Sequence, residues 1–191
     1  DWWEGKKFVR PIRAWAGGAS NETTRDICQK ELVGQPDDPT ARGTGSIPLN
    51  LIGETVRKAG VPNAMNSLVI KHVTGGWSRL AFKAYEMGKE KWMGETVDVV
   101  WLDEEPPSSI YTQSLTRTAD KGGIVYMTFT PESGMTETVA QFVNKFFLRC
   151  RPMSVKCVNA VFLNWGLVLY FLLQKKILFA NRLRYLATGL E

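Results

Sequence analysis

The chain is poor in the residues that build disulfide frameworks and metal clusters. Its 191 residues include three cysteines and one histidine. The cysteines, Cys28, Cys150 and Cys157, are an odd number without C-x-x-C spacing, and His72 has no second histidine to partner it. A disulfide scaffold and a zinc site are therefore not expected, His72 is expected to be structural, and a reducing compartment is the default.

The N-terminal residues lack the features of a secretion signal. Residues 1–5 contain no initiator methionine, no basic segment and no apolar segment. The sequence therefore predicts no signal peptide at this position.

A phosphate-binding loop of the form G-x-x-x-x-G-K-[ST] is also missing. The glycine clusters at 17–18, 43–45 and 75–76 all lack the lysine and the hydroxyl residue that complete such a loop. Because this loop binds the nucleotide phosphates, a nucleotide site in this chain would lack its phosphate-binding half.

Acidic residues are almost absent from the C-terminal quarter. Residues 145–191 carry eight Lys or Arg and one acid, Glu191, whereas residues 1–144 carry 16 basic and 18 acidic residues. The pI of about 9.2 therefore arises from the last quarter of the chain. It predicts no basic nucleic-acid-binding surface on residues 1–144.

The same C-terminal segment is unusually apolar. Hydrophobic residues occupy 29 of its 47 positions, and residues 158–174 carry no charge before Lys175 and Lys176. A membrane span needs about 20 apolar residues. Three interpretations stay open: a transmembrane helix, a buried or interfacial helix, and a translated frame that did not evolve as protein.

Strand and helix patterns alternate through the rest of the chain. The expected elements are a strand at 9–15, a helix at 21–33, a surface loop at 35–48, a helix at 49–59, a hairpin of strands 67–73 and 78–85, a strand at 97–102, a helix at 108–119 capped by Ser108 or Ser109, a strand at 124–130 and a helix at 136–144. The succession over 97–130 is a βαβ unit, which implies parallel strands. The prediction is an α/β fold, a mainly parallel sheet flanked by helices.

Two carboxylates follow the apolar run Val99–Leu102 directly. Ligands bind beyond the carboxyl ends of the strands in open α/β sheets, where Asp103 can hold Mg²⁺ and Glu104 can polarise a water for attack on a phosphate. This is the Walker B pattern. By itself it is also consistent with acidic residues placed at the positive end of the following helix.

The next strand of the βαβ unit also ends in polar residues, Thr128 and Thr130. Many nucleotide-driven motors place a residue that senses the phosphate at this position. The alternative is that both threonines are ordinary strand residues on one face.

Six separate segments resemble one protein family. They are residues 1–8 (DWWEGKKF), 21–26 (NETTRD), 43–48 (GTGSIP), 82–86 (FKAYE), 101–107 (WLDEEPP) and 128–131 (TFTP). In this order they resemble the ATPase domain of the large terminase subunit of tailed bacteriophages, over about residues 1–143. A plain structural protein with a chance acidic turn would not explain all six.

The resemblance implies a P-loop NTPase-like fold and an ATP-driven motor that packages double-stranded DNA into a procapsid. Its implied cofactors are ATP and Mg²⁺. Its implied partners are double-stranded DNA, the portal protein, the small terminase subunit and further copies in a ring, in the cytoplasm of the bacterial host.

Residue roles follow from the resemblance. Asp103 matches the aspartate that positions Mg²⁺, and Glu104 matches the catalytic glutamate, with Glu105 as the fallback. Thr128 and Thr130 match the nucleotide-contacting coupling motif. The bulky residue between these threonines departs from the small residue of the wider family, so which of them senses the phosphate stays open.

The sequence also departs from the family at both ends. The Walker A loop is expected upstream of residue 1, and nothing that resembles the nuclease domain follows residue 144. The predicted division is a partial ATPase domain at 1–144 and an unrelated, frame-shifted or non-native tail at 145–191. The chain is expected to be a truncated prophage remnant, inactive alone. The alternative is a non-catalytic module anchored to a membrane or a partner by its apolar C-terminal helix, with no specific membrane partner predicted.

Overall fold

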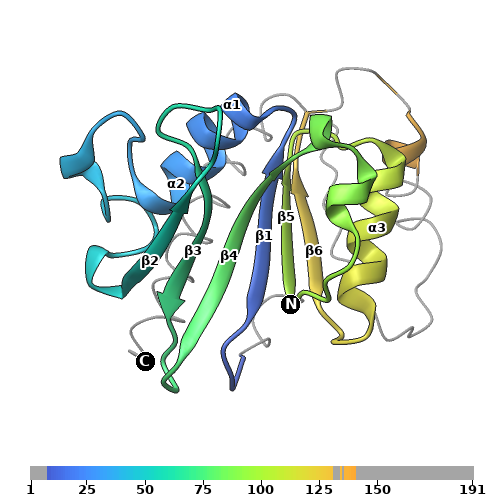
Figure 1. Cartoon of the computed structure of the whole chain (residues 1–191). Helices are drawn as coiled ribbons and strands as arrows, with labels where there is room; N and C mark the ends of the chain where they lie inside the picture. Colours follow the sequence, from blue (N-terminus) through green and yellow to red (C-terminus); the bar gives the residue numbers. More distant parts are fainter. Residues whose placement is uncertain (1–7, 131–133, 135, 141–191) are drawn as a thin grey trace, which may run out of the picture.

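The structure is a computed structural model, and it describes residues 8–130, 134 and 136–140. These residues form a six-stranded sheet with helices on both faces (Figure 1). The strands are β1 (Arg13–Gly18), β2 (Ile52–Arg57), β3 (Met65–Lys71), β4 (Trp77–Ala84), β5 (Val99–Asp103) and β6 (Ile124–Thr128). The predicted α/β class is confirmed.

The helical segments are mostly short. They are α1 (Asn21–Thr23), the π-helix η1 (Thr24–Gln29), α2 (Lys30–Val33), the 3₁₀ turns η2 (Pro39–Ala41), η3 (Leu49–Leu51), η4 (Tyr85–Met87) and η5 (Lys89–Trp92), and α3 (Ser108–Ala119). Residues 137–140 are also helical, and the rest of the helix predicted at 136–144 lies outside the described residues. The tail at 145–191 lies outside them too.

The strand order is β2-β3-β4-β1-β5-β6. Strand β1 is parallel to both β4 and β5, and β5 is parallel to β6, whereas the β2–β3 and β3–β4 pairs are antiparallel. The predicted hairpin and the predicted βαβ unit, β5-α3-β6, are both confirmed. The carboxyl ends of β1, β4, β5 and β6 therefore meet at one edge of the sheet.

The helix predicted at 49–59 is wrong. The structure has the turn η3 there, followed by strand β2, which pairs with β3 from Ile52 opposite Ile70 to Arg57 opposite Met65. Strand β2 lies at the edge of the sheet, and its register with β3 shifts, so its burial does not alternate regularly. Pairing with β3, which the local sequence does not reveal, decides its conformation.

The predicted start of the first strand and the predicted cap of the helix at 108–119 also differ from the structure. Strand β1 begins at Arg13 rather than Val9, because Pro11 has no N–H to donate to a neighbouring strand and Val9 is 84% exposed. Helix α3 has its predicted bounds, but the residue at its N-cap is Pro107, without a side-chain cap. The predicted serine cap is therefore wrong.

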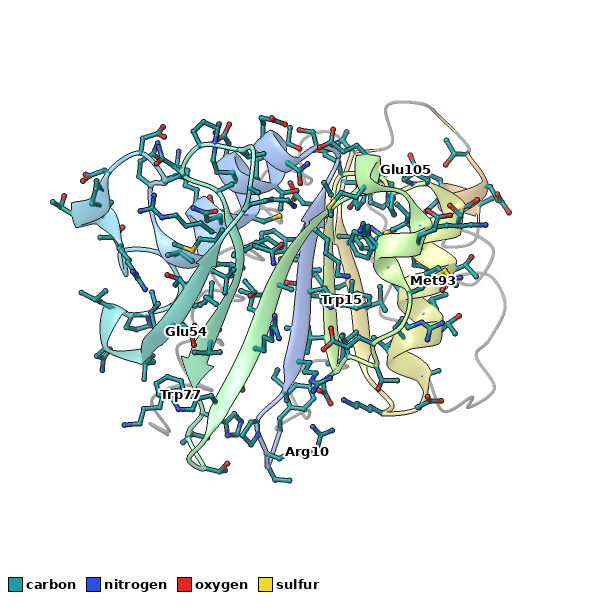
Figure 2. The ribbon with its side chains drawn as sticks, in the orientation of Figure 1. Arg10, Trp15, Glu54, Trp77, Met93 and Glu105 are labelled. Carbon is teal, nitrogen blue, oxygen red and sulfur yellow. The ribbon has the colours of Figure 1, made fainter. Side chains whose placement is uncertain are left out.

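Two apolar clusters fill the two faces of the sheet. One lies between β1, β5, β6, η5 and α3, and it includes Trp15, Trp92 and Leu102. The other lies against the 21–33 helix and includes Leu32 and Phe82. Figure 2 shows Trp15 on the central strand. Burial on both faces explains why β5 reads as an uninterrupted apolar run.

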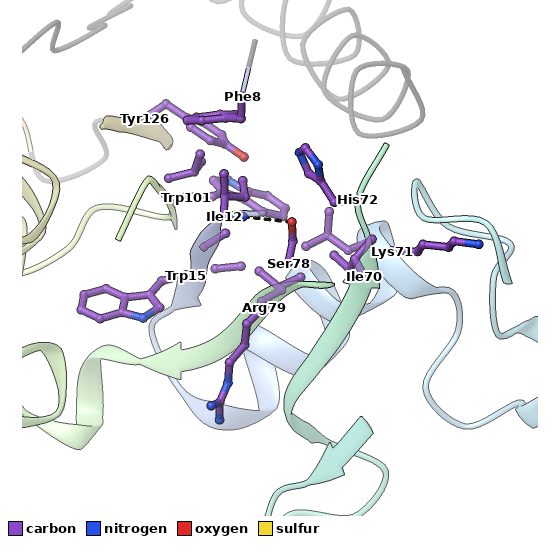
Figure 3. A pocket seen from close by; sticks show the side chains of 15 residues that line it. Phe8, Ile12, Trp15, Ile70, Lys71, His72, Ser78, Arg79, Trp101 and Tyr126 are labelled. Carbon is purple, nitrogen blue, oxygen red and sulfur yellow. Dashed lines mark hydrogen bonds between the residues drawn. The ribbon is translucent and has the colours of Figure 1, made fainter. Parts of the chain in front are cut away.

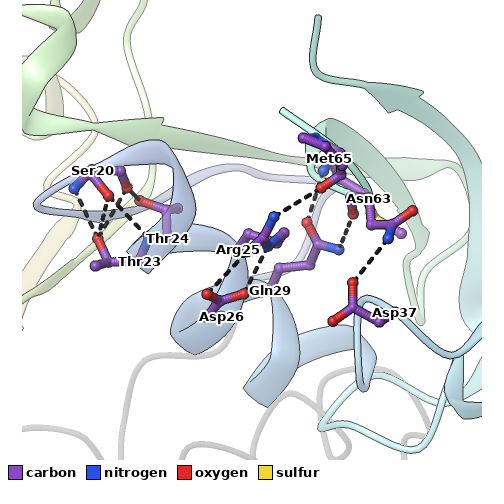
Figure 4. A network of polar contacts seen from close by, with 10 residues as sticks. Ser20, Thr23, Thr24, Arg25, Asp26, Gln29, Asp37, Asn63 and Met65 are labelled. Carbon is purple, nitrogen blue, oxygen red and sulfur yellow. Dashed lines mark hydrogen bonds and ion pairs between the residues drawn. The ribbon is translucent and has the colours of Figure 1, made fainter. Parts of the chain in front are cut away.

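A polar network joins the 21–33 helix to the turn before β3 (Figure 4). The Gln29 side-chain amide donates to the carbonyl of Asn63 at 2.9 Å and accepts from the Met65 amide at 2.7 Å. Arg25 donates to the carbonyl of Pro62 and pairs with Asp26. Gln29 is buried. The helix is thus fixed to the antiparallel half of the sheet by hydrogen bonds as well as by apolar packing.

No helix in the described part of the chain is long and apolar enough to cross a membrane. The uncharged stretch at 158–174 lies outside that part, and so does the prediction made for it.

Asp98 fixes the start of β5. Its side chain is 1% exposed, accepts from Arg10 at 2.7 Å and from the Arg13 amide at 3.0 Å, and lies 3.6 Å from Lys121 Nζ. Burial acts to raise the pKa of Asp98, but the Arg13 amide and the Arg10 and Lys121 charges hold that pKa below its ordinary value. The carboxylate therefore stays ionised in the folded chain.

Asp98→Asn should lower the free energy of unfolding by about 2 kcal/mol at neutral pH, because a neutral amide replaces the charged carboxylate as the hydrogen-bond acceptor. An aspartate with a lowered folded pKa contributes stability above its unfolded pKa of about 3.9, and this contribution is lost as the pH falls through the folded pKa. Urea unfolding at neutral and acidic pH should show the difference between the two chains shrink in acid. The exposed Asp120→Asn is the matched control, and a pH-independent difference at Asp98 would contradict the prediction.

Candidate functional site

The ends of β5 and β6 bring Asp103 and Thr128 together. The two residues are paired in the parallel register, and the hydroxyl of Thr128 donates to Asp103 Oδ1 at 2.6 Å. Trp101 Nε1 in turn donates to the hydroxyl of Thr128 at 2.9 Å. The Asp103 residue is 6% exposed. The threonine thus orients a carboxylate that is held at the carboxyl edge of the sheet.

Glu104 follows Asp103 in an unusual backbone conformation. Its φ is +63°, in the left-handed region, and its amide donates to the carbonyl of Thr128 at 2.9 Å. A non-glycine residue in this region costs about 1–2 kcal/mol. Unlike Asp103, Glu104 is exposed. The two neighbouring carboxylates therefore have different surroundings, as two different chemical roles would require.

The other predicted site residues lie farther along the same two loops. Glu105, the fallback for Glu104, accepts a hydrogen bond from the hydroxyl of Thr136. Thr130 lies two residues beyond the end of β6. The structure therefore joins Asp103 to Thr128 directly and engages Glu105 with the segment after β6. The roles assigned to these residues stay predictions.

No role was predicted for Tyr85, yet its hydroxyl reaches the same edge. It lies 2.8 Å from the carbonyl oxygen of Asp103 and 3.2 Å from that of Glu104. Tyr85 belongs to the FKAYE segment and directly follows strand β4. Beyond the FKAYE segment itself the sequence held no signal for this position, because the parallel pairing of β4 with β1 is seen only in the structure.

The end of β1 is joined to β4 by a buried threonine. The Thr24 hydroxyl accepts from the Gly18 amide at 3.1 Å and lies 3.0 Å from the carbonyl oxygen of Lys83, to which it can donate. Thr24 is 2% exposed. Residue Thr24 belongs to the NETTRD segment, so this segment has a structural function at the edge.

Lys83 lies near the same edge but is occupied by the protein. Its Nζ lies 4.0 Å from the centre of the Trp15 ring and donates to the carbonyl of Lys91. Burial lowers the pKa of Lys83 to about 8. Its contacts with the indole and the carbonyl hold the amine on the side of the sheet that α3 and η5 cover, rather than leaving it to bind phosphate.

The donor set at the edge fits Mg²⁺. Mg²⁺ prefers oxygen ligands, keeps several waters and is held by one or two carboxylates together with phosphate oxygens. Asp103 supplies a carboxylate and Thr128 a hydroxyl oxygen at 2.6 Å from it. Among the described residues no group of three or more His, Cys, Asp or Glu could hold a metal ion. An ion here would therefore need phosphate and water to complete its shell.

An apolar cavity of about 100 Å³ lies away from this edge (Figure 3). Its walls include Ile12, Ser78 and Val99, at or next to the amino ends of β1, β4 and β5. His72 also lines it, with Nδ1 2.8 Å from the Thr74 hydroxyl, and burial lowers the pKa of His72. Lys71 and Arg79 also line the cavity, but the surface inside it is almost entirely apolar. Such a surface does not suit a triphosphate.

Comparison with known proteins identifies the family. The family described as terminase large subunit, T4likevirus-type, N-terminal, matches residues 10–167. The chain belongs to the large terminase subunit family. It is 40% identical, over 162 residues, to the "Terminase, large subunit" of Salmonella phage P22. The match covers 82% of this chain and 32% of the phage P22 protein, so the chain spans about a third of that relative. No solved structure matches the chain.

The family match also corrects one expectation. The resemblance was expected to end near residue 143, with nothing of the family in the tail, but the match continues to residue 167. That end is therefore too early. The recognition of the family from its six segments is confirmed.

Proposed function

We propose that the chain carries the acidic edge of the ATPase of a DNA-packaging terminase, on a P-loop NTPase-like sheet. The observation that carries the proposal is the pair Asp103 and Thr128, joined at 2.6 Å at the carboxyl ends of two parallel strands. In open α/β sheets this is the edge where ligands bind. The following residue, Glu104, is exposed at that same edge.

In this proposal Asp103 is the Walker B aspartate that would hold Mg²⁺, and Thr128 fixes its orientation. Bound with ATP, Mg²⁺ would neutralise the phosphate charge that develops during hydrolysis. Glu104 would accept a proton from the attacking water, because it is the exposed carboxylate of the two. Thr128 and Thr130 would report the state of the nucleotide to the rest of the motor.

The activity of the whole motor belongs to the proposal as well. We infer packaging of double-stranded DNA in the host cytoplasm, with the portal protein, the small terminase subunit and a ring of copies as partners. The chain alone would be inactive, because its sequence has no phosphate-binding loop. Its origin as a truncated prophage remnant stays a prediction. The alternative, an anchored non-catalytic module, rests on residues 158–174, outside the described part.

Binding of Mn²⁺·ATP tests the proposed site, because Mn²⁺ replaces Mg²⁺ at oxygen ligands and broadens nearby NMR signals even when binding is weak. We expect the amide signals of Asp103, Glu104 and Thr128 to broaden first. Asp103→Asn should weaken this binding by about tenfold or more, because the loss of a residue that only orients a metal ligand already weakens metal binding by about that factor.

The matched control is Asp120→Asn, which makes the same charge change at an exposed position at the end of α3. It should leave the broadening at the edge unchanged. Equal broadening in the wild-type and Asp103→Asn chains would overturn the proposed site.

A further inference from the structure

Tyr85 lies where three segments of the carboxyl edge converge. It begins η4, directly after β4, and is 7% exposed. Its hydroxyl lies 2.8 Å from the carbonyl oxygen of Asp103, 3.2 Å from that of Glu104 and 3.3 Å from that of Gly17. One buried hydroxyl therefore contacts the end of β1, the end of β5 and the residue after β5.

This hydroxyl acts as a donor. A phenol has a single proton, so the shortest contact, to the carbonyl of Asp103, is its main hydrogen bond, and the others share the proton. Burial raises the pKa of Tyr85 well above its ordinary value, and the negative charge of Asp103 and Glu104 raises it further. Tyr85 thus keeps its proton throughout the neutral pH range.

The contacts bracket the strained residue. Glu104 has φ +63°, and its amide is held by the carbonyl of Thr128 at 2.9 Å. Its carbonyl, and that of Asp103 before it, face the Tyr85 hydroxyl. A side-chain-bearing residue keeps a left-handed backbone only where its surroundings hold it. The hydrogen bonds on both sides of Glu104 supply that hold.

We propose that Tyr85 is a positioning residue: its hydroxyl holds the peptide carbonyls of Asp103 and Glu104, keeps Glu104 in its left-handed turn, and so sets the relative placement of the two carboxylates. The inference rests on the proposed function of Asp103 and Glu104. It adds to that function a residue 18 positions away from Asp103, directly after strand β4.

The aromatic core fixes the phenol ring independently of its hydroxyl. The Tyr85 ring packs on Trp92 with 5.9 Å between ring centroids, and Trp92 meets Trp15 edge-on at 5.7 Å. Tyr85→Phe therefore removes the hydrogen bonds and keeps the ring packing. Tyr111→Phe removes a hydroxyl from a tyrosine of the same cluster, 1% exposed, and is the matched control.

Amide hydrogen exchange and the HN–Hα coupling of Glu104 give a readout that does not depend on ATP. We expect Tyr85→Phe to speed exchange of the Glu104 amide about tenfold, the equivalent of one lost hydrogen bond. The coupling should move away from its left-handed value. Tyr111→Phe should change neither, and uniform acceleration along β5 and β6 in Tyr85→Phe would reduce Tyr85 to a structural role and overturn the proposal.

A rescue variant separates positioning from general packing. Glycine adopts the left-handed conformation without strain. Adding Tyr85→Phe to a Glu104→Gly chain should therefore leave Mn²⁺·ATP binding as it is in Glu104→Gly alone. Adding Tyr85→Phe to the wild-type chain should weaken that binding several-fold. An equal loss in both backgrounds would contradict positioning.

The two proposals fail in distinguishable ways. If Asp103→Asn weakens Mn²⁺·ATP binding while Tyr85→Phe changes neither exchange nor binding, the positioning inference fails and the proposed site stands. If Asp103→Asn leaves Mn²⁺·ATP binding unchanged but Tyr85→Phe still speeds exchange of the Glu104 amide, the proposed site fails. In that case the stabilisation of the Glu104 turn by Tyr85 is supported.

Discussion

Replacing Trp92 with alanine is expected to lower the free energy of unfolding by about 3–5 kcal/mol, as is typical for a large aromatic residue deleted from a core. Trp92 is 0% exposed, contacts the rings of Trp15 and Tyr85, and donates from Nε1 to the carbonyl of Ala84 at 3.3 Å. The substitution leaves a cavity beneath the carboxyl edge, which the rigid sheet cannot close. Urea unfolding followed by circular dichroism measures the loss.

Trp77→Ala is the matched control for Trp92→Ala. Trp77 is 56% exposed and begins β4 at the opposite end of that strand (Figure 2). Its replacement should cost about 1 kcal/mol, because only part of its surface is buried. Similar losses at the two tryptophans would show that the aromatic cluster does not dominate the core.

The cavity left by Trp92→Ala should also loosen the Glu104 turn at the carboxyl edge. Trp92 supports the ring of Tyr85, and a side chain at Gly17 would have its Cβ 2.5 Å from an atom of Trp92. The tryptophan therefore sets how closely the end of β1 approaches η5. Trp92→Ala should release the Glu104 amide to exchange even in conditions where the chain stays folded, because the support of Tyr85 is lost.

The part of the fold that the sequence predicted best is the βαβ unit. Helix α3 occupies the predicted residues, and β5 and β6 lie within a residue or two of their predicted bounds. In these elements the local pattern and the tertiary environment agree, since an apolar run suits a strand buried on both faces. The prediction failed at the edge strand β2, where a helix was expected. Pairing with β3 makes this segment a strand, and its own sequence does not show that pairing.

Only part of the candidate site could be predicted in the same way. The meeting of Asp103 and Thr128 follows from parallel pairing, which brings the ends of neighbouring strands together. The left-handed turn at Glu104 could not be predicted, because glutamate gives no signal for positive φ. The reach of the Tyr85 hydroxyl could not be predicted either, because it depends on the order of strands that are distant in sequence.

Gly34→Ala should cost at least about 3 kcal/mol or prevent folding, the range reserved for severe backbone and core disruptions. Gly34 ends α2 with φ +121°, and a Cβ there would lie 1.9 Å from the carbonyl oxygen of Ala41. The neighbouring loop cannot move away, because Gly43 and Ile47 donate to the carbonyls of Val33 and Leu32. Thermal and urea unfolding measure the loss.

Gly60→Ala separates the clash from the backbone strain. Gly60 also has a positive φ, +79°, but a Cβ there would meet nothing within 4 Å. Its replacement should cost about 1 kcal/mol, the price of a left-handed alanine. An equal loss of stability in Gly34→Ala and Gly60→Ala would mean that the 35–48 loop moves aside to accept the new methyl group, as expected of a surface loop. A much larger loss at Gly34 would show that this loop, with Ile47 1% exposed, belongs to the core that supports the sheet.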